Sequence, residues 1–198
     1  TEPISEAGAD DVMDSSNDFY TEGSYDVTSL SSIVTPLMTL PKTKWWYSTA
    51  GPGAVINDAR EAARRVGFET ANYQLDIVAL TPVPEYDWGG LGAVHGKSTW
   101  LQSTGVGVTT HELGHNYGLW HANFWDAITN HSIIASGTNL EYGNIFDTMG
   151  RAGAGPYQFN TTFKNALGWL PDPAVADATS NGVYRIFSFD TPSRVEGR

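Results

Sequence analysis

The sequence contains no cysteine, which excludes disulfide bonds, thiolate metal ligands and a thiol nucleophile. Basic residues are also scarce: 11 Lys and Arg stand against 22 Asp and Glu, which gives a formal net charge of −11. Binding to nucleic acid needs clustered Lys and Arg, so we expect no nucleic-acid partner. No apolar run approaches the roughly 18 residues of a membrane-spanning helix, so we expect no membrane span.

A chain of 198 residues with 40% hydrophobic content suits one folded domain, which we expect to be a monomer. It begins with Thr1 rather than Met, as a mature or trimmed product would. Residues 1–26 are polar and acidic, and we expect a solvated surface segment there. Its carboxylates make Ca²⁺ a second candidate ion, although their spacing matches no EF-hand loop.

Periodicity then predicts regular elements in order. Residues 33–34 and 37–40 have the composition of short strands. Apolar residues recur at helical spacing over 55–66, and Gly67 is a plausible stop. Residues 75–80 form a largely apolar run that is typical of a buried strand.

The glycine-rich run 89–94 suits an edge strand that another backbone approaches closely. Its members Gly90, Leu91, Gly92 and Ala93 are candidates for pairing with an extended substrate, and turn or core glycine is the competing interpretation. Residues 97–102 resemble a further strand.

A helix is expected over residues 106–117, with Ser103 or Thr104 as the N-cap. On it, His111 and His115 are four residues apart and therefore lie on one face. Gly118 can end the helix in a left-handed conformation. The chain can then return His121 to the same ion.

Three histidine nitrogens leave one tetrahedral position open, which is typical of catalytic Zn²⁺ rather than structural Zn²⁺. Zinc polarises a carbonyl and acidifies water, and Glu112 is placed to accept the proton as general base. His111, Glu112, His115, Gly118 and His121 together form the signature of one class of zinc peptidases when a methionine turn follows. Met149, within Asp147-Thr148-Met149-Gly150, is the candidate for that turn.

The region after His121 is looser, with no long periodic run over 122–148. Tyr142 and Tyr157 are candidate donors to a tetrahedral oxyanion. Asn160 can cap a short helix that ends near Gly168, and residues 184–189 alternate weakly, as a strand would.

With these motifs in hand, the chain resembles the metzincin zinc peptidases, and among them the gametolysin family. The resemblance rests on residues 111–122, on 141–144 running into 147–150, and on 164–169. It implies a precursor that is secreted and acts on extracellular proteins. One departure is Arg151, which stands where some metzincins carry a tyrosine ligand, so a tyrosine fifth ligand is not expected.

We therefore expect an α+β, metzincin-like zincin fold. Its twisted, mostly parallel mixed sheet would carry a backing helix and an active-site helix, and a smaller irregular C-terminal lobe would follow. Residues 1–198 would form one catalytic domain, with lobes at 1–118 and 119–198 and the possible start of a β module near 181–198. The expected activity is that of a secreted zinc endopeptidase acting on proteins or peptides. A zinc amidase acting on cell-wall peptides and a non-catalytic, metal-stabilised binding module are the alternatives.

Overall fold

The computed structural model describes residues 2–129, 135–151, 157–176 and 178–185. Its larger sheet has the strand order β1-β3-β2, formed by Asp76–Ala79, Ser98–Leu101 and Gly90–Gly92. β1 pairs with β3 in parallel, and β2 pairs with β3 antiparallel. The expected mixed sheet is therefore present, but within the described residues one of its two pairings is antiparallel, so it is not mostly parallel.

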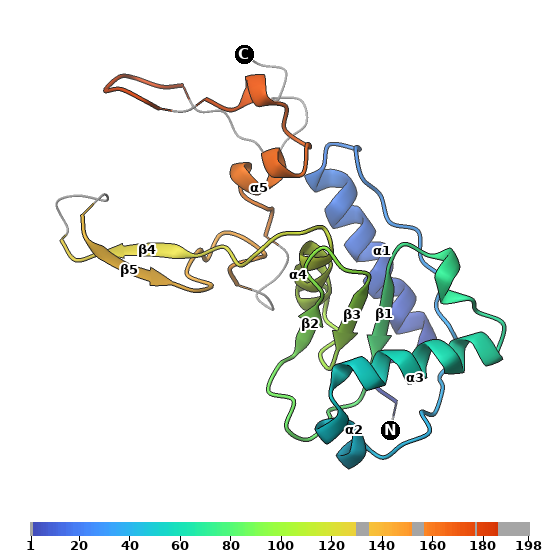
Figure 1. Cartoon of the computed structure of the whole chain (residues 1–198). Helices are drawn as coiled ribbons and strands as arrows, with labels where there is room; N and C mark the ends of the chain where they lie inside the picture. The colour runs from blue at the N-terminus through green and yellow to red at the C-terminus, as the bar shows by residue number, and fades with distance from the viewer. Residues whose placement is uncertain (1, 130–134, 152–156, 177, 186–198) are drawn as a thin grey trace.

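Two helices lie on opposite faces of the central strand β3 (Figure 1). These are α3 (Pro52–Arg65) and α4 (Val106–Asn116). Side chains alternate along the strand, so Trp100 donates its indole N–H to the Pro52 carbonyl of α3. The neighbouring Thr99 instead donates its hydroxyl to the Asn116 side chain of α4, at 2.7 Å.

The predicted helix at 55–66 and the strands at 75–80, 89–94 and 97–102 are all present with slightly different bounds. Gly67 has φ 95°, which explains its place directly after α3. α4 is also present, but the predicted N-cap is wrong. Gly105 occupies that position, and no side chain caps the helix.

The acidic N-terminal segment is the main correction. Residues Glu6–Gly23 form a long helix, α1, capped by the Ser5 hydroxyl, rather than a solvated strap. Its carboxylates face solvent, while Phe19 and Tyr20 are buried against α4. Tyr20 also donates its hydroxyl to the Thr110 carbonyl of α4 at 2.8 Å.

The strands expected at 33–34 and 37–40 are also wrong, because these residues have no regular structure. The aromatic residues that follow lie in α2 (Lys44–Ala50). Tyr47 is buried there beside Val55, Ile56 and Trp100, in a core on the α3 side of the sheet.

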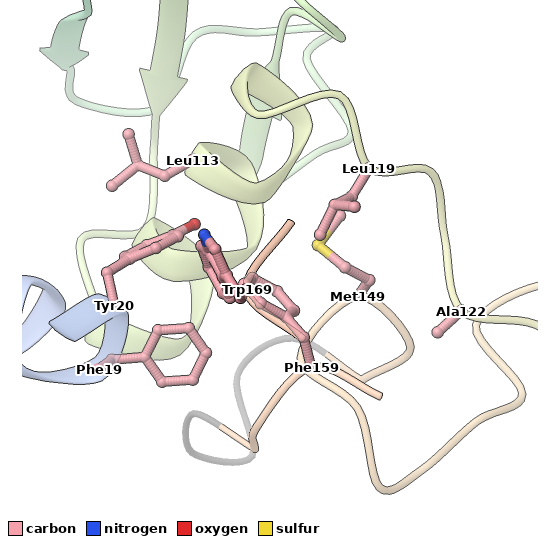
Figure 2. Close-up of a cluster of buried hydrophobic side chains, with 8 residues drawn as sticks. All are labelled: Phe19, Tyr20, Leu113, Leu119, Ala122, Met149, Phe159 and Trp169. Atoms are coloured by element: carbon pink, nitrogen blue, oxygen red, sulfur yellow. The ribbon is translucent and has the colours of Figure 1, made fainter. Parts of the chain in front are cut away.

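The second core lies on the other side, around α4 (Figure 2). It joins residues that are far apart in the chain: Phe19, Tyr20, Leu113, Leu119, Ala122, Met149, Phe159 and Trp169. Tyr20 meets Trp169 edge to face, with 6.1 Å between ring centroids. The N-terminal helix and the C-terminal segment therefore pack together on the same helix.

Beyond α4, strands β4 (Phe124–Ala127) and β5 (Gly137–Leu140) form an antiparallel hairpin in the region 122–148, where the sequence has no long periodic run. Figure 1 shows this hairpin extending away from the sheet.

Asn160 caps α5 (Thr161–Ala166) as predicted, and Gly168 follows with φ 73°. Most of the strand predicted at 184–189 lies outside the described residues. Within the described part of the chain, no helix is both long and apolar enough to cross a membrane.

Packing around Gly114 generates a stability prediction. A Cβ added at Gly114 would overlap the sulfur of Met149, which is fully buried and backed by Phe159. We expect Gly114→Ala to lower the free energy of unfolding by about 1–3 kcal/mol. The matched control is Gly53→Ala in α3, where an added Cβ meets nothing within 4 Å. That change should be neutral or stabilising by up to about 1 kcal/mol. Equal thermal stabilities of the two variants would contradict this packing.

Candidate metal centre

Helix α4 carries the first two candidate ligands on one buried face. His111 is 2% exposed and His115 is 7% exposed, and their ring centroids are 4.9 Å apart. They lie one helical turn apart, as their spacing predicts. The helix is enclosed by α1, by β2 and by the segment that contains Met149, so these rings have little freedom to turn away.

A tight turn then returns the chain toward the helix. Gly118 has φ 97°, and the N–H of Leu119 donates to the Gly114 carbonyl at 3.0 Å. Gly118 is also required for space, because an added Cβ would overlap the imidazole of His95. His95 therefore has a packing role at the end of α4. His131, the remaining histidine, lies outside the described residues.

His121 follows the turn and completes the cluster. Its ring centroid is 5.5 Å from that of His111 and 5.0 Å from that of His115. One ligand atom from each of the three rings can be chosen so that all lie within 4.8 Å of one another. In the described part of the chain, no other group of three or more His, Asp or Glu residues is placed this way. The acidic residues of α1 form no such group, and Ca²⁺ stays a prediction.

The hydrogen bonds of the three rings test whether they fit a metal ion. Nδ1 of His111 lies 2.8 Å from the Thr148 carbonyl, and Nδ1 of His115 lies 2.8 Å from the Leu119 carbonyl. Nδ1 of His121 lies 2.6 Å from a Glu141 carboxylate oxygen. Each Nδ1 therefore donates its proton to an acceptor, which leaves each Nε2 unprotonated as a ligand. This donor set fits Zn²⁺.

Burial favours the neutral, metal-binding form of these rings. Together with the neighbouring His115 and His121, it lowers the pKa of His111 to about 4, and the hydrogen bond to Thr148 opposes this shift. Burial also lowers the pKa of His115. At neutral pH these two ligands therefore carry no proton that a metal ion would have to displace.

Glu112 lies beside the histidines with its carboxylate against β2. Burial raises the pKa of Glu112 to about 7, and a hydrogen bond from the Gly92 backbone opposes that rise. The strand approaches closely only because it carries glycines. A Cβ at Gly90 would stand 2.5 Å from a Glu112 carboxylate oxygen, and one at Gly92 would overlap the helix backbone. The glycines of 90–93 are thus explained by packing and by contact with Glu112.

Met149 lies beneath the helix in a turn built by buried polar groups. Its side chain is fully buried, and its N–H donates to the Asp147 carboxylate at 2.7 Å. The other oxygen of that carboxylate accepts the backbone and side-chain N–H groups of Asn160, both at 2.7 Å. The Thr148 carbonyl accepts the hydrogen bond from Nδ1 of His111. The turn at Met149 therefore orients a candidate ligand directly.

The two candidate tyrosines differ in position. The Tyr142 ring centroid is 3.8 Å from that of His121, so Tyr142 belongs to the site. Tyr157 lies beside the Met149 turn, where its backbone carbonyl accepts a hydrogen bond from the Thr148 hydroxyl at 2.6 Å. Glu141, the partner of His121, was not among the predicted site residues. Its only signal was its place in the Glu-Tyr-Gly-Asn segment that carried the family resemblance.

Three clustered histidines, with a buried glutamate directly after the first of them in the chain, define a candidate metallohydrolase centre on an α+β scaffold. The family model described as gametolysin peptidase M11 matches residues 13–187. The chain belongs to this metallopeptidase family, as its resemblance predicted. No curated protein and no solved structure matches the chain.

The Glu112 carboxyl generates a pH prediction for the metal-free protein. The folded state holds its pKa near 7, whereas the unfolded chain returns it to 4.5. Between these values the folded state binds more protons, so this group's contribution to stability falls as pH rises from about 4.5 to about 7. Glu112→Gln removes the titration. With chelator present, this variant should melt above the wild type at pH 8 and close to it at pH 4. A gap that persists unchanged at pH 4 would contradict burial as the cause.

Proposed function

We propose that the chain is a secreted, zinc-dependent endopeptidase in which His111, His115 and His121 hold the ion and Glu112 is the general base. One observation carries the proposal. Each of the three rings donates its Nδ1–H to an acceptor of the protein, which leaves Nε2 as the ligand atom, and one ligand atom from each ring can be chosen so that all lie within 4.8 Å of one another. Family membership supports peptidase chemistry at this site.

The ion supplies Lewis-acid polarisation of the scissile carbonyl and acidifies water when it is bound. Glu112 accepts a proton from the attacking water as general base. Glu112 then returns that proton to the departing amine as the C–N bond breaks. Water supplies the hydroxyl of the new carboxyl group, and no covalent bond forms between enzyme and substrate.

The edge strand β2 is the proposed binding site for the substrate backbone. In the described sheet it pairs only with β3, and its other edge is unpaired. An extended peptide can add a strand at such an edge beside Glu112. On this proposal, the glycines of β2 bring the substrate backbone and the helix close together.

The remaining parts of the proposal concern scaffold and location. Residues 1–118 and 119–198 would form two metzincin lobes around the substrate cleft, with the turn at Met149 as a methionine turn below the histidines. The complete burial of Met149 under Gly114 supports that role. Secretion and extracellular substrates are proposed from the family resemblance alone.

Glu112→Gln tests the proposed base. The amide keeps the size of the side chain but cannot accept the proton, so casein cleavage should fall by about 10²–10⁴-fold. Zinc content should stay near one ion per chain, because all three histidines remain. The matched control is Glu22→Gln on the exposed end of α1, which should cleave casein at the wild-type rate.

Three outcomes would contradict parts of this proposal. Unchanged casein cleavage by Glu112→Gln would exclude Glu112 as the base. Chelator-sensitive cleavage of peptidoglycan by the wild type, with casein left intact, would indicate a cell-wall amidase. Zinc binding without hydrolysis of either substrate would indicate a binding module.

A further inference from the structure

The third histidine is held differently from the other two. His111 and His115 belong to a buried helix, and each donates its Nδ1–H to a backbone carbonyl. His121 lies beyond that helix, and the acceptor of its Nδ1 is the side chain of Glu141. The Glu141 side chain is 66% exposed, against 19% for His121. The orientation of the third ring therefore depends on a side chain that has freedom to move.

Tyr142 adds a second contact to the same ring. The two ring centroids are 3.8 Å apart, and the ring planes are tilted by 33°. Glu141 thus holds one edge of the imidazole, while the next residue in the chain covers its face. Together these contacts restrict both rotation in the ring plane and tilting out of it, which a single hydrogen bond does not achieve.

The backbone places Tyr142 there in a conformation that bulky residues rarely adopt. Tyr142 has φ 59°, in the left-handed region. Its N–H donates to the Asn123 side chain at 3.2 Å. The following Gly143 is tightly enclosed, because an added Cβ would stand 2.5 Å from the Cβ of Phe124. The strained turn at Tyr142 is thus held against Asn123 and Phe124, which closely follow His121 in the chain. Backbone strain of this kind is found where it positions functional groups.

We propose that Glu141 and Tyr142 form a clamp that holds His121 in its metal-binding orientation before the ion arrives. Both are positioning residues that act through His121. This proposal rests on the zinc site of the proposed function. It adds an account of how His121, the one proposed ligand outside helix α4, is oriented. The clamp needs the aromatic ring of Tyr142 and not its hydroxyl. This requirement distinguishes the clamp from the oxyanion-donor role predicted for Tyr142, which would need the hydroxyl.

The test measures metal binding by the full chain without any substrate. Zinc affinity is obtained by competition with a chromogenic chelator, and the visible spectrum of the Co²⁺-loaded protein reports the ligand geometry. Glu141→Ala and Tyr142→Ala should each weaken zinc binding by about 10–100-fold and alter the Co²⁺ spectrum. Tyr142→Phe should keep both at wild-type values. The matched control is Phe146→Ala, which removes a 78% exposed aromatic ring from the same lobe.

Wild-type zinc affinity in both alanine variants would overturn the clamp while leaving the zinc site intact. A Tyr142→Phe variant as weak as Tyr142→Ala would exclude ring stacking as the cause. Circular dichroism identifies any variant that fails to fold, and Glu141→Ala then decides, since truncating a largely exposed side chain leaves the core untouched. A wild-type protein that binds no zinc is a separate result, because it overturns the proposed function itself.

Discussion

Burial of helix α4 from all sides is the constraint on which the rest of the structure depends. Every residue from Thr109 to Asn116 is buried. A helix in this position has no solvent face, so each neighbour must match the surface it meets. A Cβ would not fit at Gly90 or Gly92 of strand β2, and a Cβ at Gly114 would overlap the Met149 sulfur. Two of the three candidate ligands, His111 and His115, therefore stand on an enclosed helix, which gives that part of the site its rigidity.

Burial of α4 also brings polar side chains into the interior. Their hydrogen bonds fix the positions of the neighbouring strands and turns. The Asn116 side chain accepts from Thr99 and donates to the Ala93 and Ser98 carbonyls, both at 3.1 Å. One amide at the end of α4 thus ties the helix to β3 and to Ala93, the residue that follows β2. Asp147 does the same for the turn at Met149. Because an unpaired buried group is costly, these networks permit few alternative registers.

Local patterns allowed much of the central fold to be predicted. The helix at 55–66, the strands around it and the turn at Gly118 follow from periodicity and from one glycine. α1 was missed because its buried face consists of Ser16, Phe19, Tyr20 and Gly23. These residues have helical spacing, but two of them are small and not hydrophobic. The acidic composition of residues 1–26 therefore led to the prediction of a solvated segment instead of a helix. The β4–β5 hairpin was missed because its large side chains are exposed and do not alternate.

The site divides in the same way. The spacing of the three histidines and the place of Glu112 could be interpreted from sequence, because a helix and one turn bring them together. Their Nδ1 acceptors could not, since two are backbone carbonyls and the third, Glu141, depends on the hairpin. These acceptors lie 37, 4 and 20 residues from the histidines they meet. A complete donor set therefore exists only once Leu119, Glu141 and Thr148 have been brought to the three rings. Metal binding at this centre is thereby coupled to the folding of the segments that carry these residues.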